Sequence, residues 1–447
     1  MGVAPIIRQI NEYREKLSEN ISHEIESENF RGRSKVGCAG VFSRDRKLTI
    51  KNLIVLMLCF RSSLQRDLDN FFKALSKSDF KIREVTKGAF TQARAKLDPW
   101  AFKRLNEVSV NTFYEGANYH VWAGMRVLAV DGTRLVLPNH SSVVEEFGQH
   151  SFGPKADSPR SLAMGSMLYD VLNQITIDAQ LAPYASSERD LLMKHLDKVK
   201  KGDLLLLDRG YPCFWLLFLL KAKGVEFCVR LKDDWWLKVN DFNSSPENER
   251  IVTFTLPRKD RKKLDGYPDF QQGGAFIPCR LIKVTLPTGE NEILCTSLID
   301  TELFLHSDFC ELYDARWGEE EAYKLLKSRI ELENFTGKTA RAVYQDFHAK
   351  ILLMTLCAAY AHPIEEKVRA EYKADRERKY DQKINRTNAI AMTQDIMIAV
   401  IIKKQYIKAL AAFDKVVSST REIIRPGRTE PRKKIPKRAY SMNYKRL

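Results

Sequence analysis

The stretch VLAVDGTRLVLP, residues 127–138, decides the fold of this chain. Apolar residues alternate on both sides of an Asp-Gly pair, Asp131 and Gly132. Alternation around Asp-Gly is typical of a β-hairpin closed by a tight turn. The same residues also suit a single strand that carries an acid, Asp131, for catalysis. The local pattern favours the turn but leaves both interpretations open, so the rest of the chain has to decide.

The totals point to a large protein with a polyanionic partner. The chain has 447 residues and a formal net charge of +16, which favours several domains and a nucleic acid ligand, with an anionic membrane surface as the rival. No apolar run in the sequence approaches the roughly 20 residues that span a bilayer. The first 25 residues do not resemble a signal peptide, and the eight cysteines are scattered. This pattern predicts reduced thiols in a cytosolic protein.

Helical patterns dominate residues 1–115. Thr49 is expected to cap a helix through KNLIVLMLCF, because its hydroxyl can accept an otherwise unpaired backbone N–H. If residues 81–105 form one helix, Arg83, Lys87 and Arg94 share a stripe. That stripe either meets phosphates or is an ordinary solvated basic face.

Strand patterns begin at residue 126. Three strands are followed by a capped helix (SSERDLLMKHLDKV, 186–199), by the strand DLLLLDRGY (203–211) that ends in an acid, and by a further helix and strand. This order predicts a mixed α/β sheet. Residues 232–304 break the alternation and read as a β-rich insertion. Helical patterns then return, with one helix expected from about 388 to 416, and the last 27 residues carry ten Lys/Arg against two Glu.

The chemistry is concentrated in LYDARWGEEEAYKLLKSRIELENFTGK, residues 312–338. On a single helix, four polar residues fall within about 60° of one another: Tyr313, Arg316, Glu320 and Lys327. Glu319 and Glu321 would point away from that stripe. The expected helix therefore has an apolar back and a front with one acid, two cations and a phenol.

Three acids stand out: Asp131, Asp208 and Glu320. A carboxylate among buried apolar residues is costly unless something compensates it. Mg²⁺ would do so, because it prefers carboxylate oxygens and shares its coordination shell with phosphates. Two such ions can clamp the attacking and leaving oxygens of a phosphodiester.

With these motifs the sequence resembles the DDE transposases of the insertion-sequence-four (IS-four) family of bacteria. The family signature is Tyr, two residues, Arg, three residues, Glu, six residues, Lys, and the four residues of the stripe match it without a spacing error. Trp317 and Lys324 also look like the family pattern. Asp131-Gly132-Thr133 and Asp208-Arg209-Gly210-Tyr211 resemble its first and second acid motifs. The resemblance covers about 125–350, extends weakly to VTKGAFTQARAKL, and does not reach 363–447.

The resemblance implies that Asp131 lies within a strand rather than in a turn. It implies catalysis and metal binding by Asp131, Asp208 and Glu320 with two Mg²⁺ ions, for which Mn²⁺ can substitute. It also implies cleavage of the ends of a mobile element and joining of the freed 3′-OH to target DNA. A hairpin intermediate would involve a stacking Trp of the insertion, either Trp235 or Trp236. The expected DNA contacts are Tyr313, Arg316, Lys327, Lys324, Trp317, Arg209, Tyr211, Arg83, Lys87 and Arg94.

The expected fold is α/β, with an RNase H-like mixed sheet core that is interrupted by a β-rich insertion. The expected domains are an N-terminal helical DNA-binding domain (1–115), the two parts of the core (116–231 and 305–375), the insertion (232–304) and a C-terminal helix with a basic tail (376–447). The implied partner is double-stranded DNA, both terminal inverted repeats and target, bound by a homodimer in a synaptic complex. No membrane is expected as a partner. The implied location is the bacterial cytoplasm, where the protein associates with the nucleoid when it is bound to DNA. The rivals are an inactive transposase-derived DNA-binding protein and a stand-alone RNase H-like nuclease.

Overall fold

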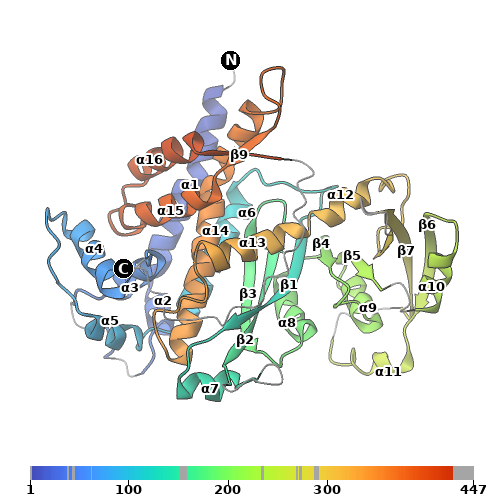
Figure 1. Cartoon of the computed structure of the whole chain (residues 1–447), viewed down its shortest axis with the longest axis horizontal. Coiled ribbons are helices and arrows are strands. Elements are labelled where there is room, and N and C mark those ends of the chain that lie inside the picture. Colours follow the sequence, from blue (N-terminus) through green and yellow to red (C-terminus); the bar gives the residue numbers. More distant parts are fainter. Residues whose placement is uncertain are drawn as a thin grey trace. The chain divides into compact units, whose positions relative to one another are not determined.

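The computed structural model divides the chain into two compact units (Figure 1). The sheet unit comprises His120–Arg134 and Met164–Tyr323, and the helical unit comprises Met1–Tyr119, Leu135–Ala163 and Lys324–Leu447. The structure describes residues 3–37, 40–42, 46–61, 63–151, 159–232, 236–267, 270, 274–285 and 291–425. None of the helices in these ranges has the length and apolar character needed to cross a membrane.

One eight-stranded sheet organises the sheet unit, in the order β3-β2-β1-β4-β5-β8-β7-β6. β1 pairs in parallel with β4, and β4 with β5, while β8, β7 and β6 are antiparallel. This confirms the expected mixed α/β sheet, with the strand order of an RNase H-like core. The strands are β1 (Val127–Val136), β2 (Leu162–Asp170), β3 (Ile175–Pro183), β4 (Leu204–Leu207), β5 (Glu226–Leu231), β6 (Glu249–Thr255), β7 (Phe276–Thr285) and β8 (Asn291–Thr296).

β1 answers the question raised by the opening stretch. It is one continuous strand from Val127 to Val136, so Asp131 and Gly132 lie inside it and the hairpin interpretation is wrong. The first four residues of β1 are fully buried, as are all four of β4. Central parallel strands are covered on both faces, which is why these segments are continuously apolar.

The insertion lengthens this sheet instead of forming a separate one. β8 pairs with β5, and its Thr296 lies opposite Cys228. β7 and β6 then follow outward, accompanied by the short helices α10 (Leu237–Ser244) and α11 (Arg258–Arg261).

Helices cover the central strands. They are α8 (Glu188–His195), the 3₁₀ turn η1 (Leu196–Lys198), α9 (Phe214–Ala222), α12 (Asp308–Asp314) and the start of α13 (Trp317–Ser328). Leu312 and Tyr313 of α12 pack with Val127, Ala129 and Leu206 in one buried cluster. Burying each large apolar side chain contributes about 1.5–3 kcal/mol, so this cluster fixes α12 on the sheet.

The helical unit contains most of the remaining elements. Thr49 caps α3 as expected, with its side chain accepting the Asn52 N–H at 3.1 Å. The long helix α14 packs against α6, and β9 and β10, which are separated in the chain by α15, η3 and α16, pair as a small antiparallel sheet. The elements are α1 (Val3–Glu26), α2 (Glu28–Arg33), α3 (Ile50–Leu58), α4 (Leu64–Ser76), α5 (Lys87–Arg94), α6 (Trp100–Gly116), α7 (Ser141–Phe147), α14 (Ala340–Glu371), β9 (Gln382–Ile384), α15 (Arg386–Met397), η3 (Ile398–Ile402), α16 (Tyr406–Ser419) and β10 (Arg421–Ile423).

Two predicted helices are wrong as single elements. Residues 81–105 contain α5 and α6, because Thr86 caps a helix that begins at Lys87, and the chain turns at Asp98-Pro99. The helix expected from 388 to 416 is also divided. It passes into the π-helical turn η3, and α16 begins only at Tyr406. Most of the basic tail, residues 426–447, lies outside the described residues.

Candidate active site

The register of β1 and β4 brings two acids to one edge of the sheet. Val127 pairs with Leu204 and Val130 with Leu207, so the next residue of each chain segment is Asp131 and Asp208, respectively. Loops and side chains that follow parallel strands gather at the carboxyl edge of the sheet, where α/β proteins bind ligands. The pairing of two apolar strands therefore places the two acids as neighbours.

Helix α13 holds the backbone of Asp131 through two side chains. The Asp131 N–H donates to Glu319 Oε1 at 2.9 Å, and the Tyr323 hydroxyl donates to the Asp131 carbonyl at 2.9 Å. Glu319 and Tyr323 are four residues apart and so share one face of the helix. This face fixes the height of α13 along β1, and with it the position of Glu320.

The Asp131 carboxyl has acidic neighbours and no ion pair among the described residues. Its Oδ1 accepts the N–H of Gly132 at 2.8 Å. The pKa of Asp131 is raised to about 6, chiefly by burial and also by Glu188 and Glu320, with the Gly132 N–H and Arg316 opposing the shift. A nearby cation would stabilise the ionised form of a carboxyl in such surroundings.

Asp208 has a buried oxygen with no protein partner. Its Oδ1 forms no hydrogen bond with any described residue. A buried carboxylate oxygen without a donor is costly and calls for an explanation such as an ion. Arg209 beside it is exposed, whereas Tyr211 is only 1% exposed and its hydroxyl is also unpartnered in the described structure.

The signature residues do not lie on one continuous helix, which corrects the prediction. α12 ends at Asp314 and α13 begins at Trp317. Tyr313 is buried, with its hydroxyl donating to the carbonyl of Leu207 at 3.3 Å, the last residue of β4. Its position beside Asp208 therefore comes from the packing of α12 on the sheet.

Arg316 lies in the junction between the two helices and is only 3% exposed. Its guanidinium is 3.4 Å from Glu320 Oε1 and stacks over the rings of Trp317 and Tyr313. Burial lowers the pKa of Arg316, but Tyr313 and three acids, Asp208, Glu320 and Asp131, outweigh burial and raise it. One cation thus lies within electrostatic range of all three predicted acids.

The consecutive glutamates of α13 differ in surroundings. The Glu320 side chain is 28% exposed and faces Arg316. Glu319 is fully buried, its Oε2 is unpartnered among the described residues, and burial followed by Asp131 raises its pKa well above the usual range. Sequence reasoning set Glu319 aside because it faces away from the signature stripe. Its contact with the Asp131 N–H depends on where α13 lies along β1, which the sequence alone does not show.

Glu188 is a second acid that sequence reasoning missed. It is the first residue of α8, and its pKa is raised by burial and by Asp208, with Arg189 opposing. In the sequence it reads as an ordinary acid in the first turn of a helix, where acids are favoured anyway. No local pattern could have shown that it reaches the ends of β1 and β4.

The donor types at this site fit a divalent cation. Carboxylates predominate, Asp208 has an oxygen without a partner in the described structure, and the pKa of Asp131 is raised by burial and by neighbouring acids. Within the described residues, no three His, Cys, Asp and Glu side chains are placed closely enough to hold a metal ion as they stand. Without a cation between them like charges repel, which opposes close approach. Hard oxygen donors of this kind are those that Mg²⁺ and Mn²⁺ prefer.

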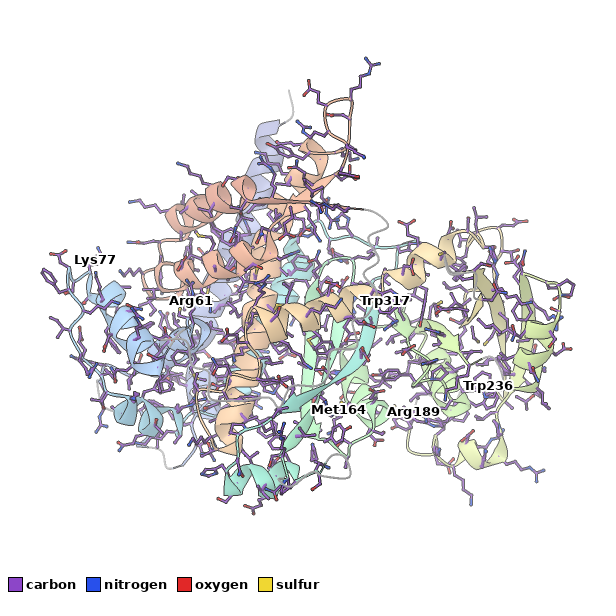
Figure 2. The ribbon with its side chains drawn as sticks, in the orientation of Figure 1. Arg61, Lys77, Met164, Arg189, Trp236 and Trp317 are labelled. Atoms are coloured by element: carbon purple, nitrogen blue, oxygen red, sulfur yellow. The ribbon has the colours of Figure 1, made fainter. Side chains whose placement is uncertain are left out.

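The other predicted DNA contacts are dispersed. Trp317 is 44% exposed. Lys324 is exposed and Lys327 half-buried, and both lie further along α13, in the part that belongs to the helical unit. Trp236 stacks on Phe214 with ring centroids 4.2 Å apart (labelled in Figure 2), and Trp235 lies outside the described residues.

The basic stripe expected in residues 81–105 does not form. Arg83 precedes α5 and is exposed, 3.4 Å from Asp69, and Lys87 is exposed at the start of α5. Arg94 is instead 3% exposed and paired with Asp346 at 2.8 Å in the interior of the helical unit. The stripe fails because it assumed one helix, and because the guanidinium of Arg94 is saturated by protein partners.

These features define a class: an α/β protein with an RNase H-like sheet and a carboxylate site at the ends of β1 and β4. The family described as "Transposase DDE domain" matches residues 122–356, more than half of the chain. The chain belongs to this family.

Two curated relatives from Escherichia coli (strain K12) are of the same kind. The chain is 22% identical to transposase InsG for insertion sequence element IS4 over 277 residues, 61% of this chain and 60% of that protein. It is 24% identical to putative transposase InsZ over 147 residues, 31% of this chain and 47% of that protein. The matches thus span about half to three-fifths of these relatives, and they confirm the resemblance to the IS-four family.

A solved structure is also similar. It is the cryo-EM structure of the piggyBac transposase synaptic complex with hairpin DNA, with a TM-score of 0.47 and 8% identity over 89% of this chain and 85% of that one.

Proposed function

We propose that this protein is a DNA transposase that binds the terminal inverted repeats of an insertion sequence, cleaves the element ends and joins the 3′-OH ends to target DNA. The observation that carries the proposal is the β1–β4 register, which makes Asp131 and Asp208 neighbours. Helix α13 is fixed to Asp131 through Glu319 and Tyr323, and so presents Glu320 to the same site.

Asp131, Asp208 and Glu320 would hold two Mg²⁺ ions, with Mn²⁺ as a substitute. When bound, divalent ions supply charge neutralisation at a phosphodiester and an acidified water. The protein's own part is to orient the carboxylates. Glu319 and Tyr323 fix the backbone of Asp131, and Tyr313 fixes the carbonyl that precedes Asp208.

Arg316 is suited to bind the phosphate at the cleavage point. Its guanidinium is held by the rings of Tyr313 and Trp317, so its orientation is largely set before DNA arrives. A preoriented guanidinium binds phosphate oxygens through paired N–H donors. The fully ionised Arg316 also offsets part of the repulsion among the acids.

The wider DNA contacts and the assembly are part of the same proposal. The net charge of +16 supports a polyanionic partner, and the last 27 residues contribute +8 of it, from ten Lys/Arg and two Glu. A homodimer that pairs two element ends, and a nucleoid-bound state in a bacterial cytoplasm, follow from the proposed reaction. The hairpin step is proposed with Trp235 as its stacking residue, since Trp236 already stacks on Phe214.

The test uses purified protein and DNA duplexes that end in the terminal repeats flanking its gene, with Mg²⁺. The variant is Glu320→Gln, and the matched control is Glu321→Gln on the exposed side of the same helix. We expect the wild type and the control to nick and join, and Glu320→Gln to bind DNA without cutting. If the wild type binds but does not cut, the chain is a DNA-binding protein. If it cuts without joining, it is a nuclease.

A further inference from the structure

Glu188 reaches the candidate active site from an element that the transposase signatures do not include. It opens α8, the helix between β3 and β4. The side chain of Ser187 accepts the Asp190 N–H at 3.1 Å and so caps the helix. A capped start fixes which residue stands in the first turn.

The Glu188 carboxylate occupies the space left by two glycines. A Cβ atom added to Gly132 would lie 2.8 Å from Glu188 Oε1, and one added to Gly210 would lie 3.3 Å from Glu188 Oε2. Gly132 follows Asp131, and Gly210 belongs to the Asp208 motif. The two acid motifs therefore leave room, through their glycines, for the same third carboxylate.

Both ends of α8 are anchored within the sheet unit. At its start, Arg189 donates from Nε to the carbonyl of Tyr211 at 3.0 Å and from Nη2 to that of Gly210 at 2.9 Å (Arg189 is labelled in Figure 2). These bonds tie the helix to the loop that follows Asp208. The placement of Glu188 is therefore specified by its neighbour in sequence.

At its end, His195 lies seven residues after Glu188 and so on the same helical face. Its Nε2 is 3.0 Å from Ser166 Oγ and its Nδ1 is 2.7 Å from Asp178 Oδ2. The trio has the arrangement of a hydrolytic triad, but Ser166 and His195 are fully buried and beyond the reach of a substrate. The trio instead fastens α8 to β2 and β3, with Glu188 on the fastened face.

The Glu188 carboxylate has no direct cationic partner in the described part of the chain, and Arg189 acts on it only through a weaker electrostatic interaction. No ion pair or hydrogen bond to its carboxylate is formed by the residues that the structure describes, although Asp131 and Asp208 are close enough to interact with it electrostatically. Tyr211 is 1% exposed and close to the same acids, yet its hydroxyl also lacks a partner there. A buried phenol left unbonded among carboxylates indicates that their oxygens are oriented toward something else.

We propose that Glu188 is a fourth carboxylate of this site and binds a divalent cation together with Asp131 and Asp208. The inference rests on the proposed function and extends its set of metal-binding residues to α8. Three carboxylates, from β1, from α8 and from the residue after β4, would compensate the charge of such an ion. The two glycines then have a specific role, which is to admit the Glu188 carboxylate.

The test measures Mn²⁺ binding to the metal-free full-length protein by isothermal titration calorimetry, without DNA. The variant Glu188→Gln is compared with Asp190→Asn, which removes an exposed acid from the same helix. We expect Glu188→Gln to weaken Mn²⁺ binding about tenfold or more, since even outer partners of metal sites cost about 10- to 100-fold. Asp190→Asn should bind as the wild type does.

Thermal unfolding without metal checks that the variants fold, and Glu188→Gln should unfold at the same temperature as the wild type or higher. If it does not fold, Glu188→Asp replaces it, with the charge kept but drawn back by one methylene, and weakened Mn²⁺ binding is again expected. Wild-type affinity in the folded Glu188 variant overturns the inference, whether or not the protein cuts DNA. Binding through Glu188 in a protein that cuts no element end would uphold the inference and overturn the proposed function.

Discussion

Two groups of buried charge, one in each unit, are built in opposite ways. In the helical unit, Arg94 donates from Nε to Gln345, from Nη1 to Thr336 and from Nη2 to Asp346. Asp346 in turn accepts the Thr336 N–H at 2.7 Å. In the sheet unit, four acids interact electrostatically with the buried guanidinium of Arg316, namely Asp131, Asp208, Glu319 and Glu320, and a fifth acid, Glu188, interacts with Asp131 and Asp208.

The difference separates a structural pair from a functional site. A buried pair such as Arg94 and Asp346, whose guanidinium makes four hydrogen bonds to protein groups, needs no further ligand, and removing one partner is what destabilises the protein. A surplus of carboxylates, in which oxygens of Asp208 and Glu319 find no partner among the described residues, raises the free energy of the folded protein unless a ligand compensates it. Perturbed acids of this kind gather where chemistry is done.

The largest expected effect is on catalysis, at the acidic site of the sheet unit. Asp131→Asn should reduce cleavage by more than the roughly 100-fold that loss of an outer partner of a metal site costs. Without metal, the variant should unfold at the same temperature or higher, because the wild-type carboxyl has a pKa raised to about 6 and its ionisation at pH 7 destabilises the folded protein, which the neutral amide avoids. Duplex cleavage and thermal unfolding measure the two effects. A variant that cuts as the wild type does would remove Asp131 from the site.

The next largest expected effect is on the stability of the protein, at the buried pair Arg94 and Asp346. Arg94→Met leaves Asp346 as an unpaired buried charge and should lower the free energy of unfolding by about 3–5 kcal/mol. Urea denaturation of the full chain measures it. The double variant Arg94→Met/Asp346→Leu should recover most of that loss, because no lone charge remains. A single variant as stable as the wild type would mean that the contrast between the two groups is not energetic.

Variants of Glu319 test whether this acid acts on catalysis indirectly, by positioning Asp131. Glu319→Leu removes the acceptor of the Asp131 N–H and should slow cleavage about 10- to 100-fold. Glu319→Gln keeps that acceptor, and since the pKa of Glu319 is raised well above its usual range, the neutral amide should restore activity close to wild type. Rescue by Gln in single-turnover cleavage marks a positioning residue. Equal loss in both variants would require the charge itself.

Part of the acidic site could be predicted from the sequence, because buried parallel strands have a recognisable apolar pattern. The continuous apolar run before Asp208 predicts a buried strand. The pattern around Asp131 favours a turn by itself, and only the family resemblance indicates a strand there. The sequence and the resemblance together thus found the two acids. Glu320 was found by the spacing of its motif rather than by the helix that was assumed to contain it.

What could not be predicted depends on register between distant elements. Glu319 meets Asp131 only because α13 lies at one height on β1, and Glu188 enters only because two glycines leave space for it. Arg94 was expected to be exposed on the face of one long helix. Instead α5 ends at Arg94, and its side chain is buried against Asp346. Local periodicity carries no information on which face of an element another segment covers.

The pH dependence of metal binding sharpens the comparison further. Metal ligation needs ionised carboxylates, and the pKa of Asp131 is raised to about 6. Mg²⁺ affinity should therefore fall by up to about tenfold per pH unit below pH 6 and level off above about pH 7. Without metal, the contribution of Asp131 to stability has the opposite sense. It is present below the ordinary pKa of 3.8 and is lost as the pH rises through about 6. Calorimetry from about pH 5 to pH 8 measures the affinity, and a flat profile would contradict the assignment.

The smallest expected effect concerns cations of the helical unit that are free of the buried pair. Lys87 is exposed at the start of α5, and Arg83 is 64% exposed in its side chain with only a loose contact to Asp69. If each contacts a phosphate, Lys87→Ala or Arg83→Ala should weaken DNA binding a few-fold and reduce the slope of log K against log salt by about 0.9. Lys103→Ala, an exposed cation on α6, is the matched control and should leave the slope unchanged. Fluorescence anisotropy over a salt series reads the slope directly. A change in affinity with an unchanged slope would trace the effect to folding rather than to phosphate contact, because only released counterions alter the slope.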